Sequence, residues 1–432
     1  GLGDVYKRQL PFTASCSEGS VPEPCAELPT RTVLVYLAGD NNLEEIGRTP
    51  ELLRQGWKDT GSKCLIYYDA PQAAPKLFAL TIRHSDASSV LETVEEYPEE
   101  NSSSAGVFGR VLADVVRKYP SDSYGLIFAS HGSGWLPCGA LSDPTRTIGD
   151  DRTPGTTGGA REMEITDFAA AIPDHQFDFI IFEACLMSGI EVAYELRNKT
   201  DYLLASSAEL LVPGYAPVYP TAFQYLFDTS LGVPQALEKF AGSYFNYIDT
   251  RNGAYRSATQ SIVYTREMDA LAILAGKTTG NTHGRWDDAL LGKLQHFDRP
   301  GSYGDIPARP RYFDFGQYMA YLAPERQADL DALLRKTVVW KAATPEFMAG
   351  YNGFTILPST EEYHHLHGEV VSYGILVMLT ADKQYAERDR LLAFNRSIGL
   401  PTHLADIHAR PEDLPAVTEK ALAGIDVRVW PY

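Results

Sequence analysis

Residues 177–191 read FDFIIFEACLMSGIE, an apolar run of strand length that reaches a cysteine and continues into a helical pattern. Cys185 stands where the first pattern gives way to the second. Free cysteine usually behaves as a small buried hydrophobic residue. The stretch alone therefore leaves two interpretations open, a core position or a thiol held at the tip of a strand.

The same arrangement recurs along the chain. Apolar runs of strand length are predicted at 31–40, 63–70 and 76–84, and a strand that leads into a loop is predicted at 124–135 and at 201–214. Helical patterns are predicted at 41–57 (with Asn42 as N-cap), 105–120, 165–173, 186–200, 233–250 and 328–343. Continuous apolar strands that alternate with amphipathic helices indicate a mostly parallel sheet covered on both faces.

We therefore expect an α/β fold in three parts, because 432 residues exceed the usual size of one core. Residues 1–30 form an N-terminal tail, residues 31–230 form the α/β core, and residues 231–432 form a smaller α+β region packed on that core.

Composition narrows the function classes. The chain has 38 Lys and Arg residues and 56 Asp and Glu residues, which gives a net charge of −18. Phosphate binding needs a basic surface, so nucleic acid is not expected as a partner, whereas basic peptides suit an acidic surface. Five cysteines without CxxC spacing indicate neither a disulfide framework nor a zinc site.

Small residues precede Cys16 in LPFTASCSEGS (10–20), as they do at the lipidation site of bacterial lipoproteins, although Thr13 replaces the usual leucine. Two interpretations remain open, a disordered tail and a lipidated cysteine followed by a tether. The second predicts an exported protein of the cell envelope, attached to a membrane through Cys16.

Polar residues follow several of the predicted strands. Asp40, His131, Cys185 and the segment Ser206–Glu209 all lie at or just past the carboxyl end of a strand. In parallel sheets this edge is where ligands bind. The grouping favours the functional interpretation of Cys185.

A histidine can generate the thiolate that acts as the nucleophile. His131 lies in ASHGSGW (129–135), where small neighbours leave its imidazole accessible. A helix that begins soon after Cys185 is expected to lower the pKa of the thiol. The N–H groups of Gly132 and Cys185 are candidates for an oxyanion hole.

Four segments together resemble the clostripain-like cysteine peptidases, relatives of caspases, gingipains and legumain. They are LVYLAGDNNLEE, YGLIFASHGSGW, FDFIIFEACLMSGIEVAYEL and LLASSAELLVPGYAPVY. The resemblance covers roughly residues 31–400. It implies a caspase-like fold, a catalytic dyad of His131 and Cys185, and endopeptidase activity on proteins or peptides without a cofactor.

At one position this sequence departs from the pattern of the family. Members that cleave after Arg or Lys usually carry Asp two residues before the cysteine, where this chain has Glu183. The carboxylate is kept, so a basic P1 residue (the residue before the scissile bond) is still expected. We also expect Asp40, Ser207 and Glu209 to contact the substrate. Some relatives bind calcium, but no EF-hand-like run is present, and no metal site is expected.

Some relatives mature by cutting themselves between the histidine and cysteine strands. The corresponding stretch, 141–165, is rich in Gly and Thr and offers Arg146, Arg152 and Arg161 as cleavage sites. A surface loop that merely contains arginines is the alternative. Two other functions stay open, a catalytically silent binding lipoprotein and a legumain-like peptide ligase. A monomer is expected.

Overall fold

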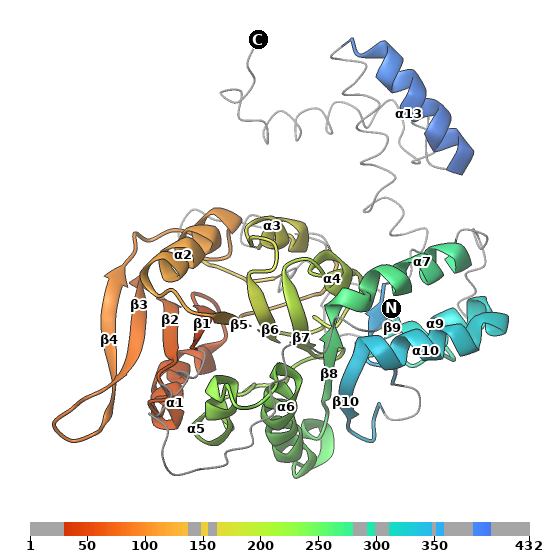
Figure 1. Cartoon of the computed structure of the whole chain (residues 1–432). Coiled ribbons are helices and arrows are strands. Elements are labelled where there is room, and N and C mark those ends of the chain that lie inside the picture. Colours follow the sequence, from red (N-terminus) through yellow and green to blue (C-terminus); the bar gives the residue numbers. More distant parts are fainter. Residues whose placement is uncertain are drawn as a thin grey trace, which may run out of the picture.

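The computed structural model describes residues 30–136, 148–153, 162–279, 292–298, 311–347, 351–357 and 383–398. Within these ranges a nine-stranded sheet crosses the molecule in the order β10-β8-β7-β6-β5-β1-β2-β3-β4 (Figure 1). Its strands are β1 (Arg31–Ala38), β2 (Lys63–Ala70), β3 (Ala73–Ile82), β4 (Ser89–Glu96), β5 (Ser123–Ala129), β6 (Phe177–Glu183), β7 (Thr200–Ala205), β8 (Thr259–Tyr264) and β10 (Val338–Ala343). A separate two-stranded sheet pairs β9 (Phe313–Asp314) with β11 (Thr355–Ile356).

The five central strands, β2, β1, β5, β6 and β7, are mutually parallel. Strands β3 and β4 continue the sheet antiparallel on one side, and β8 and β10 do so on the other. All eight residues of β1, at the centre, are buried, as expected for a strand covered on both faces. The predicted mostly parallel α/β sheet is confirmed.

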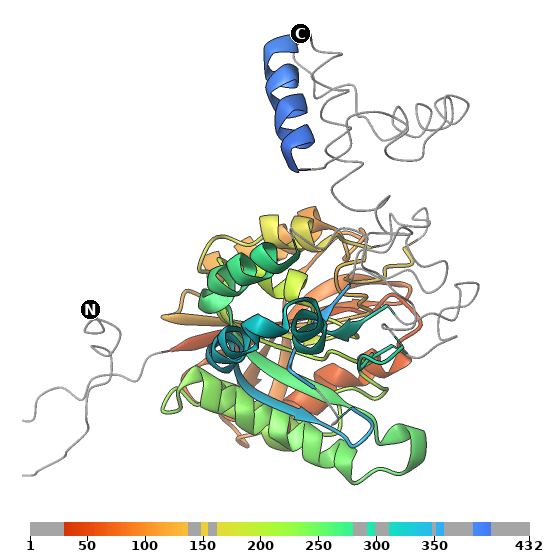
Figure 2. The ribbon, with the colours of Figure 1, turned by 90° about the vertical axis from the view of Figure 1, so that its right-hand side faces the viewer.

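Helices cover both faces of the sheet. The α-helices are α1 (Thr49–Gly56), α2 (Ala105–Lys118), α3 (Ile165–Ala170), α4 (Ile190–Glu195), α5 (Tyr219–Ala222), α6 (Val233–Asp249), α7 (Met268–Thr279), α9 (Phe315–Leu322), α10 (Gln327–Thr337) and α13 (Tyr385–Ile398). The 3-10 helices are η1 (Glu44–Arg48), η3 (Phe223–Phe227), η4 (Gly253–Tyr255), η5 (Thr265–Glu267) and η6 (Pro324–Arg326). Helices α2, α3, α4 and α7 lie on one face, and α1, α5 and α6 on the other (Figures 1 and 2).

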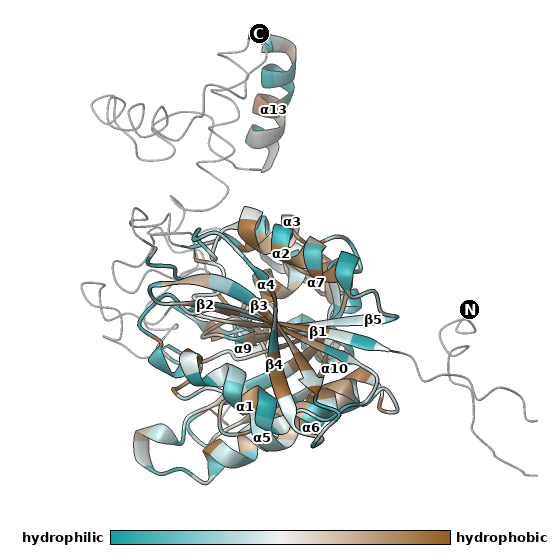
Figure 3. Cartoon of the chain, turned by 90° about the vertical axis from the view of Figure 1, so that its left-hand side faces the viewer, coloured by the Kyte–Doolittle hydropathy of each residue, from teal (hydrophilic) through white to brown (hydrophobic). Residues whose placement is uncertain are grey.

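The helices are amphipathic. They carry hydrophilic and hydrophobic residues side by side, while much of the sheet between them is hydrophobic (Figure 3). In α2, the buried residues are Val107, Phe108, Val111, Leu112 and Val115. These positions recur every three or four residues, so one stripe of the helix packs on the sheet.

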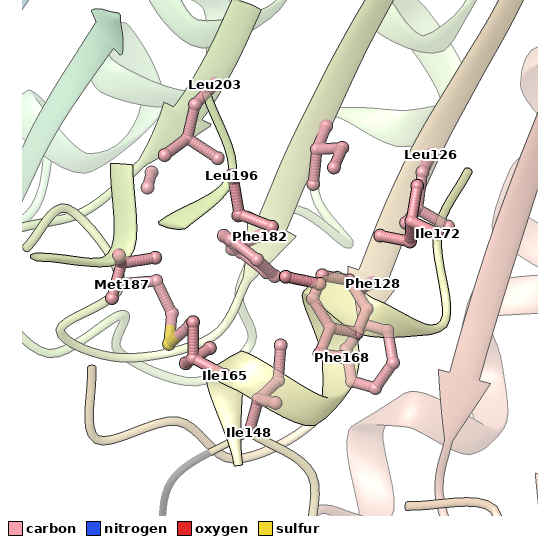
Figure 4. Packing of buried hydrophobic residues seen from close by; sticks show 14 of the residues in the cluster. Leu126, Phe128, Ile148, Ile165, Phe168, Ile172, Phe182, Met187, Leu196 and Leu203 are labelled. Carbon is pink, nitrogen blue, oxygen red and sulfur yellow. The ribbon is translucent and has the colours of Figure 1, made fainter. Parts of the chain in front are cut away.

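Phe128 of β5 lies in the core beneath α2 and α3 (Figure 4). Its ring is fully buried and stacks on Tyr36, with 5.1 Å between centroids. We expect Phe128→Ala to lower the free energy of unfolding by about 3–5 kcal/mol, because it leaves a cavity. Urea unfolding measures this loss. Tyr255→Ala, at a 66% exposed position, should change it by less than about 0.5 kcal/mol, and equal losses in the two variants would contradict this packing.

Some predicted elements differ from the structure. The helix predicted at 328–343 ends at Thr337, and its second half is strand β10, which pairs antiparallel with β8. Strand β4 was not predicted at all. Because β8 and β10 come from beyond residue 231 yet belong to the central sheet, the division into a core and a C-terminal region stays a prediction.

Asp69 lies fully buried near the carboxyl end of β2. Burial raises the pKa of its carboxyl to about 8, and the nearby Asp151 adds to the rise. The unfolded chain has an aspartate pKa of about 3.9. The folded protein therefore holds this proton more tightly, and the free energy of unfolding falls as pH rises between the two values.

Asp69→Asn removes this titration. Between about pH 5 and pH 7, we expect the free energy of unfolding of the wild type to fall relative to that of the variant by about 1.4 kcal/mol per pH unit. Denaturant unfolding of both proteins across this range measures the difference. Parallel curves would show that Asp69 ionises normally in the folded protein.

Candidate active site

A cavity opens at the carboxyl ends of the central strands. Four segments supply its walls: Leu43, Glu45, Ile46 and Thr49 from the first, then residues 129–131, residues 183–185, and Leu210 with residues 212–214. Sheet register brings two of them together, because Ala129 at the end of β5 pairs with Glu183 at the end of β6. His131 and Cys185 each lie two residues beyond this pair, and both line the cavity.

His131 is 6% exposed and is held through both its backbone and its ring. The N–H of Gly149 donates to the carbonyl oxygen of His131 over 2.9 Å. The ring Nε2 lies 2.6 Å from Oδ1 of Asn42. The imidazole therefore sits at the cavity in a restrained position.

Cys185 carries a half-buried thiol and follows β6 by two residues. Its sulfur accepts a hydrogen bond from the N–H of Leu210 over 3.3 Å. The next residue, Leu186, has a left-handed φ of 62° and donates its N–H to Ala208 over 3.1 Å. A non-glycine residue rarely adopts this conformation, so the chain turns sharply just after the thiol.

This turn corrects one expectation. The helix predicted to begin soon after Cys185 begins only at Ile190 and has six residues. Residues 184–189 are not helical, with a turn at 185–186, so the N-terminus of α4 does not follow Cys185 directly as predicted. In this structure the backbone N–H of Leu210 is what contacts the sulfur.

Gly132 packs directly on the cysteine turn. A Cβ atom at this position would lie 2.8 Å from the carbonyl oxygen of Cys185 and 2.8 Å from the sulfur of Met187. Only glycine allows the histidine and cysteine loops to approach so closely. The role of the Gly132 and Cys185 N–H groups in an oxyanion hole stays a prediction.

Glu183 contributes a carboxylate to the cavity. Its Oε1 accepts the N–H of Tyr215 over 2.7 Å, and its Oε2 accepts the hydroxyl of Tyr219. Burial raises the pKa of this carboxyl to about 7, against the lowering effect of the two hydrogen bonds. Gly214 has a φ of 60°, and a Cβ there would lie 2.5 Å from Oε1, so the loop can wrap the carboxylate only with glycine at this position.

Three residues expected to contact substrate are placed differently. Ser207 is fully buried, and its N–H donates to Oγ1 of Thr259 over 3.0 Å, so the prediction of a substrate contact by its side chain is not supported. Asp40 and Glu209 are half-buried. None of these three residues is among the described residues that line the cavity.

Of the predicted cleavage sites, the structure describes only Arg152. Its N–H donates to the carbonyl oxygen of Asp40 over 2.8 Å, and the preceding Asp150 and Asp151 are buried. This backbone is held against the core, which disfavours cleavage there. Arg146 and Arg161 lie outside the described residues, as does the predicted lipidation site Cys16.

Later segments of the chain also support the cysteine turn, which the sequence did not indicate. Leu186 packs in a small apolar cluster with Phe297, Tyr312, Phe347 and Tyr351, and Cys185 contacts the same cluster. The hydroxyl of Tyr312 donates to the carbonyl oxygen of Ser133 over 2.6 Å. Segments beyond residue 290 therefore pack against both loops of the site.

The sequence did not indicate the contact between Asn42 and His131. Asn42 was predicted as the N-cap of a helix, but the chain forms η1 only from Glu44 and α1 from Thr49. Its side chain instead contacts His131, 89 residues further along the chain. The one available signal was its place just past the end of a central strand, where ligand-binding residues gather.

In the described ranges, no group of three or more His, Cys, Asp or Glu side chains is placed to hold a metal ion. No helix in the part of the chain that the structure describes is long and apolar enough to cross a membrane.

Comparison with known proteins supports this picture. The model of the clostripain family, peptidase family C11, matches residues 35–273. Clostripain of Hathewaya histolytica is 26% identical over 290 residues, which are 60% of this chain and 52% of clostripain. The chain thus spans about half the length of this curated relative.

Two solved structures share the fold. One is an inactive zymogen C11 protease from Parabacteroides distasonis, with TM-score 0.61 and 28% identity over 77% of this chain and 92% of that chain. The other is a secreted C11 cysteine protease from Bacteroides thetaiotaomicron in complex with an irreversible peptide inhibitor, with TM-score 0.64 and 26% identity over 78% and 96%. With its family model matched over more than half its length and its caspase-like sheet, the chain belongs to the clostripain family of cysteine peptidases.

Proposed function

We propose that this chain is a cysteine endopeptidase that cleaves protein or peptide substrates through His131 and Cys185. The observation that carries the proposal is that both side chains line one cavity, at equivalent positions past the paired ends of β5 and β6. A thiol beside an imidazole is what nucleophilic catalysis by cysteine needs. Membership of the clostripain family supports the same chemistry.

In the proposed reaction, His131 takes the proton of the Cys185 thiol, and the thiolate attacks the carbonyl carbon of the scissile bond. The N–H groups of Gly132 and Cys185 stabilise the oxyanion that forms. The C–N bond then breaks, and the imidazolium gives its proton to the leaving amine. Water, deprotonated by His131, hydrolyses the thioester and restores the thiol.

We further propose that Glu183 directs cleavage to a basic P1 residue. Its carboxylate and Cys185 line the same cavity. The walls of this cavity also include the apolar side chains of Ile46, Val212 and Pro213. Such walls suit the aliphatic stem of Arg or Lys, and the carboxylate suits its charged end. Two hydrogen bonds from Tyr215 and Tyr219 leave the carboxylate with further lone pairs for a guanidinium or ammonium group.

We also propose that the protein is exported, because the Bacteroides thetaiotaomicron relative is described as secreted. Attachment to the cell envelope through Cys16 and a monomeric state remain predictions.

A fluorogenic peptide library varied at P1, with product masses recorded, tests the proposal. We expect cleavage after Arg and Lys, with free acids as products even when an amine nucleophile is added. Amine-linked products would indicate the ligase alternative. No cleavage of any peptide, even after limited proteolysis of the 141–165 loop, would favour the binding-protein alternative.

A further inference from the structure

Asn42 contacts one nitrogen of the proposed catalytic imidazole. Its amide oxygen lies 2.6 Å from Nε2 of His131. A side-chain amide oxygen only accepts hydrogen bonds, so Nε2 must donate and therefore carries a proton in this pair. In the neutral imidazole the other nitrogen, Nδ1, is then the one left to accept a proton.

The neighbouring Asn41 holds this contact in place. Its Nδ2 donates to the carbonyl oxygens of Ala38, at the end of β1, and of Asp150, over 2.8 Å and 2.9 Å. Its Oδ1 accepts the N–H of Leu43 over 2.8 Å. The backbone on both sides of Asn42 is thus tied to the edge of the sheet that carries His131, although Asn42 itself is exposed.

We propose that Asn42 is a positioning residue for His131, which fixes the ring orientation and the tautomer in which Nε2, and not Nδ1, carries the proton. The inference rests on the proposed function of the dyad. An imidazole without such a partner can rotate and place its proton on either nitrogen, and partners of this kind fix the reactive form of a histidine. As an amide, Asn42 supplies orientation without adding a negative charge.

Two substitutions of Asn42 separate the effect of its acceptor oxygen from the effect of a charge at this position. Asn42→Ala removes the acceptor, whereas Asn42→Asp keeps an acceptor and adds a charge that favours the imidazolium. Glu44→Ala is the matched control, because Glu44 is an exposed acidic residue two positions further along the same loop. Activity against an Arg peptide and the rate of iodoacetamide alkylation of Cys185 are both measured as functions of pH.

We expect Asn42→Ala to lower kcat by about 10- to 100-fold with KM within about twofold. The pH midpoint of Cys185 alkylation should also rise toward the ordinary thiol value of about 8.5. Asn42→Asp should retain more activity than Asn42→Ala and move the alkaline limb of the pH profile to higher pH. Glu44→Ala should match the wild type in both measurements.

Two outcomes overturn the inference. One is an active wild type whose activity and alkylation profile are unchanged in Asn42→Ala. The other is a uniform loss in Asn42→Ala and Asn42→Asp with an unchanged alkylation profile, which would indicate a structural role alone. A wild type that cleaves nothing would contradict the proposed function instead, and alkylation would still report whether Asn42 governs the His131–Cys185 pair.

Discussion

Replacing Cys185 by alanine is expected to lower kcat by at least about 10⁴-fold, because no other group can form the acyl-enzyme bond. His131→Ala should cost a similar factor, since a thiol without its base attacks slowly at neutral pH. The double variant should be hardly worse than either single one, because the two groups act as a unit. Steady-state hydrolysis of the preferred peptide, with thermal unfolding to verify the fold, measures all three.

Cys64→Ala is the matched control for removal of a thiol. Cys64 is 1% exposed in β2, and burial raises the pKa of its thiol, so it cannot serve as a nucleophile in the folded protein. The control variant should keep wild-type kcat. Activity that survives in Cys185→Ala but is lost in Cys64→Ala would refute the assignment of the nucleophile.

Substitution of Glu183 by glutamine should change selectivity rather than chemistry. We expect kcat/KM for Arg and Lys at P1 to fall by about 10²-fold, the scale of losing one partner of a buried charge pair. Peptides with a neutral P1 residue should lose only a few-fold. Glu45 also lines the cavity, but its side chain is 43% exposed and pairs with Arg48, so Glu45→Gln should have a much smaller effect.

The same residue predicts a pH dependence. A glutamate whose pKa is raised to about 7 is mostly neutral below that pH and mostly charged above it, so its attraction for a basic P1 residue is present above pH 7 and lost below it. The ratio of kcat/KM for Arg over Leu at P1 should therefore rise severalfold from about pH 6 to pH 8. Glu183→Gln should remove the rise. A constant ratio in the wild type would show that Glu183 does not bind the P1 side chain.

The central strands could be predicted because a strand buried on both faces is a continuous run of apolar residues. Strand β2 covers the predicted residues 63–70, and β1, β5, β6 and β7 lie within or close to their predicted runs. The edges of the sheet could not be predicted in the same way. Strand β4 reads SVLETVEE, in which five acidic or polar residues accompany three apolar ones and no residue is fully buried. Strand β10 follows α10 without a break, so only pairing with β8 makes it a strand.

The site shows the same division. The positions of His131 and Cys185 follow from two parallel strands that end in register, which a sequence pattern can indicate. The contact that Asn42 makes and the burial of Ser207 depend on residues far along the chain, His131 and Thr259. Local propensity cannot report such contacts.

The most direct test of the central claim is covalent labelling of the wild-type protein with a peptidyl ketone electrophile that carries Lys at P1, followed by peptide mapping. The account predicts one adduct per chain, on Cys185, formed much more slowly in His131→Ala and not formed in Cys185→Ala. An adduct on another cysteine, or labelling of Cys185 at the same rate with and without His131, would contradict it.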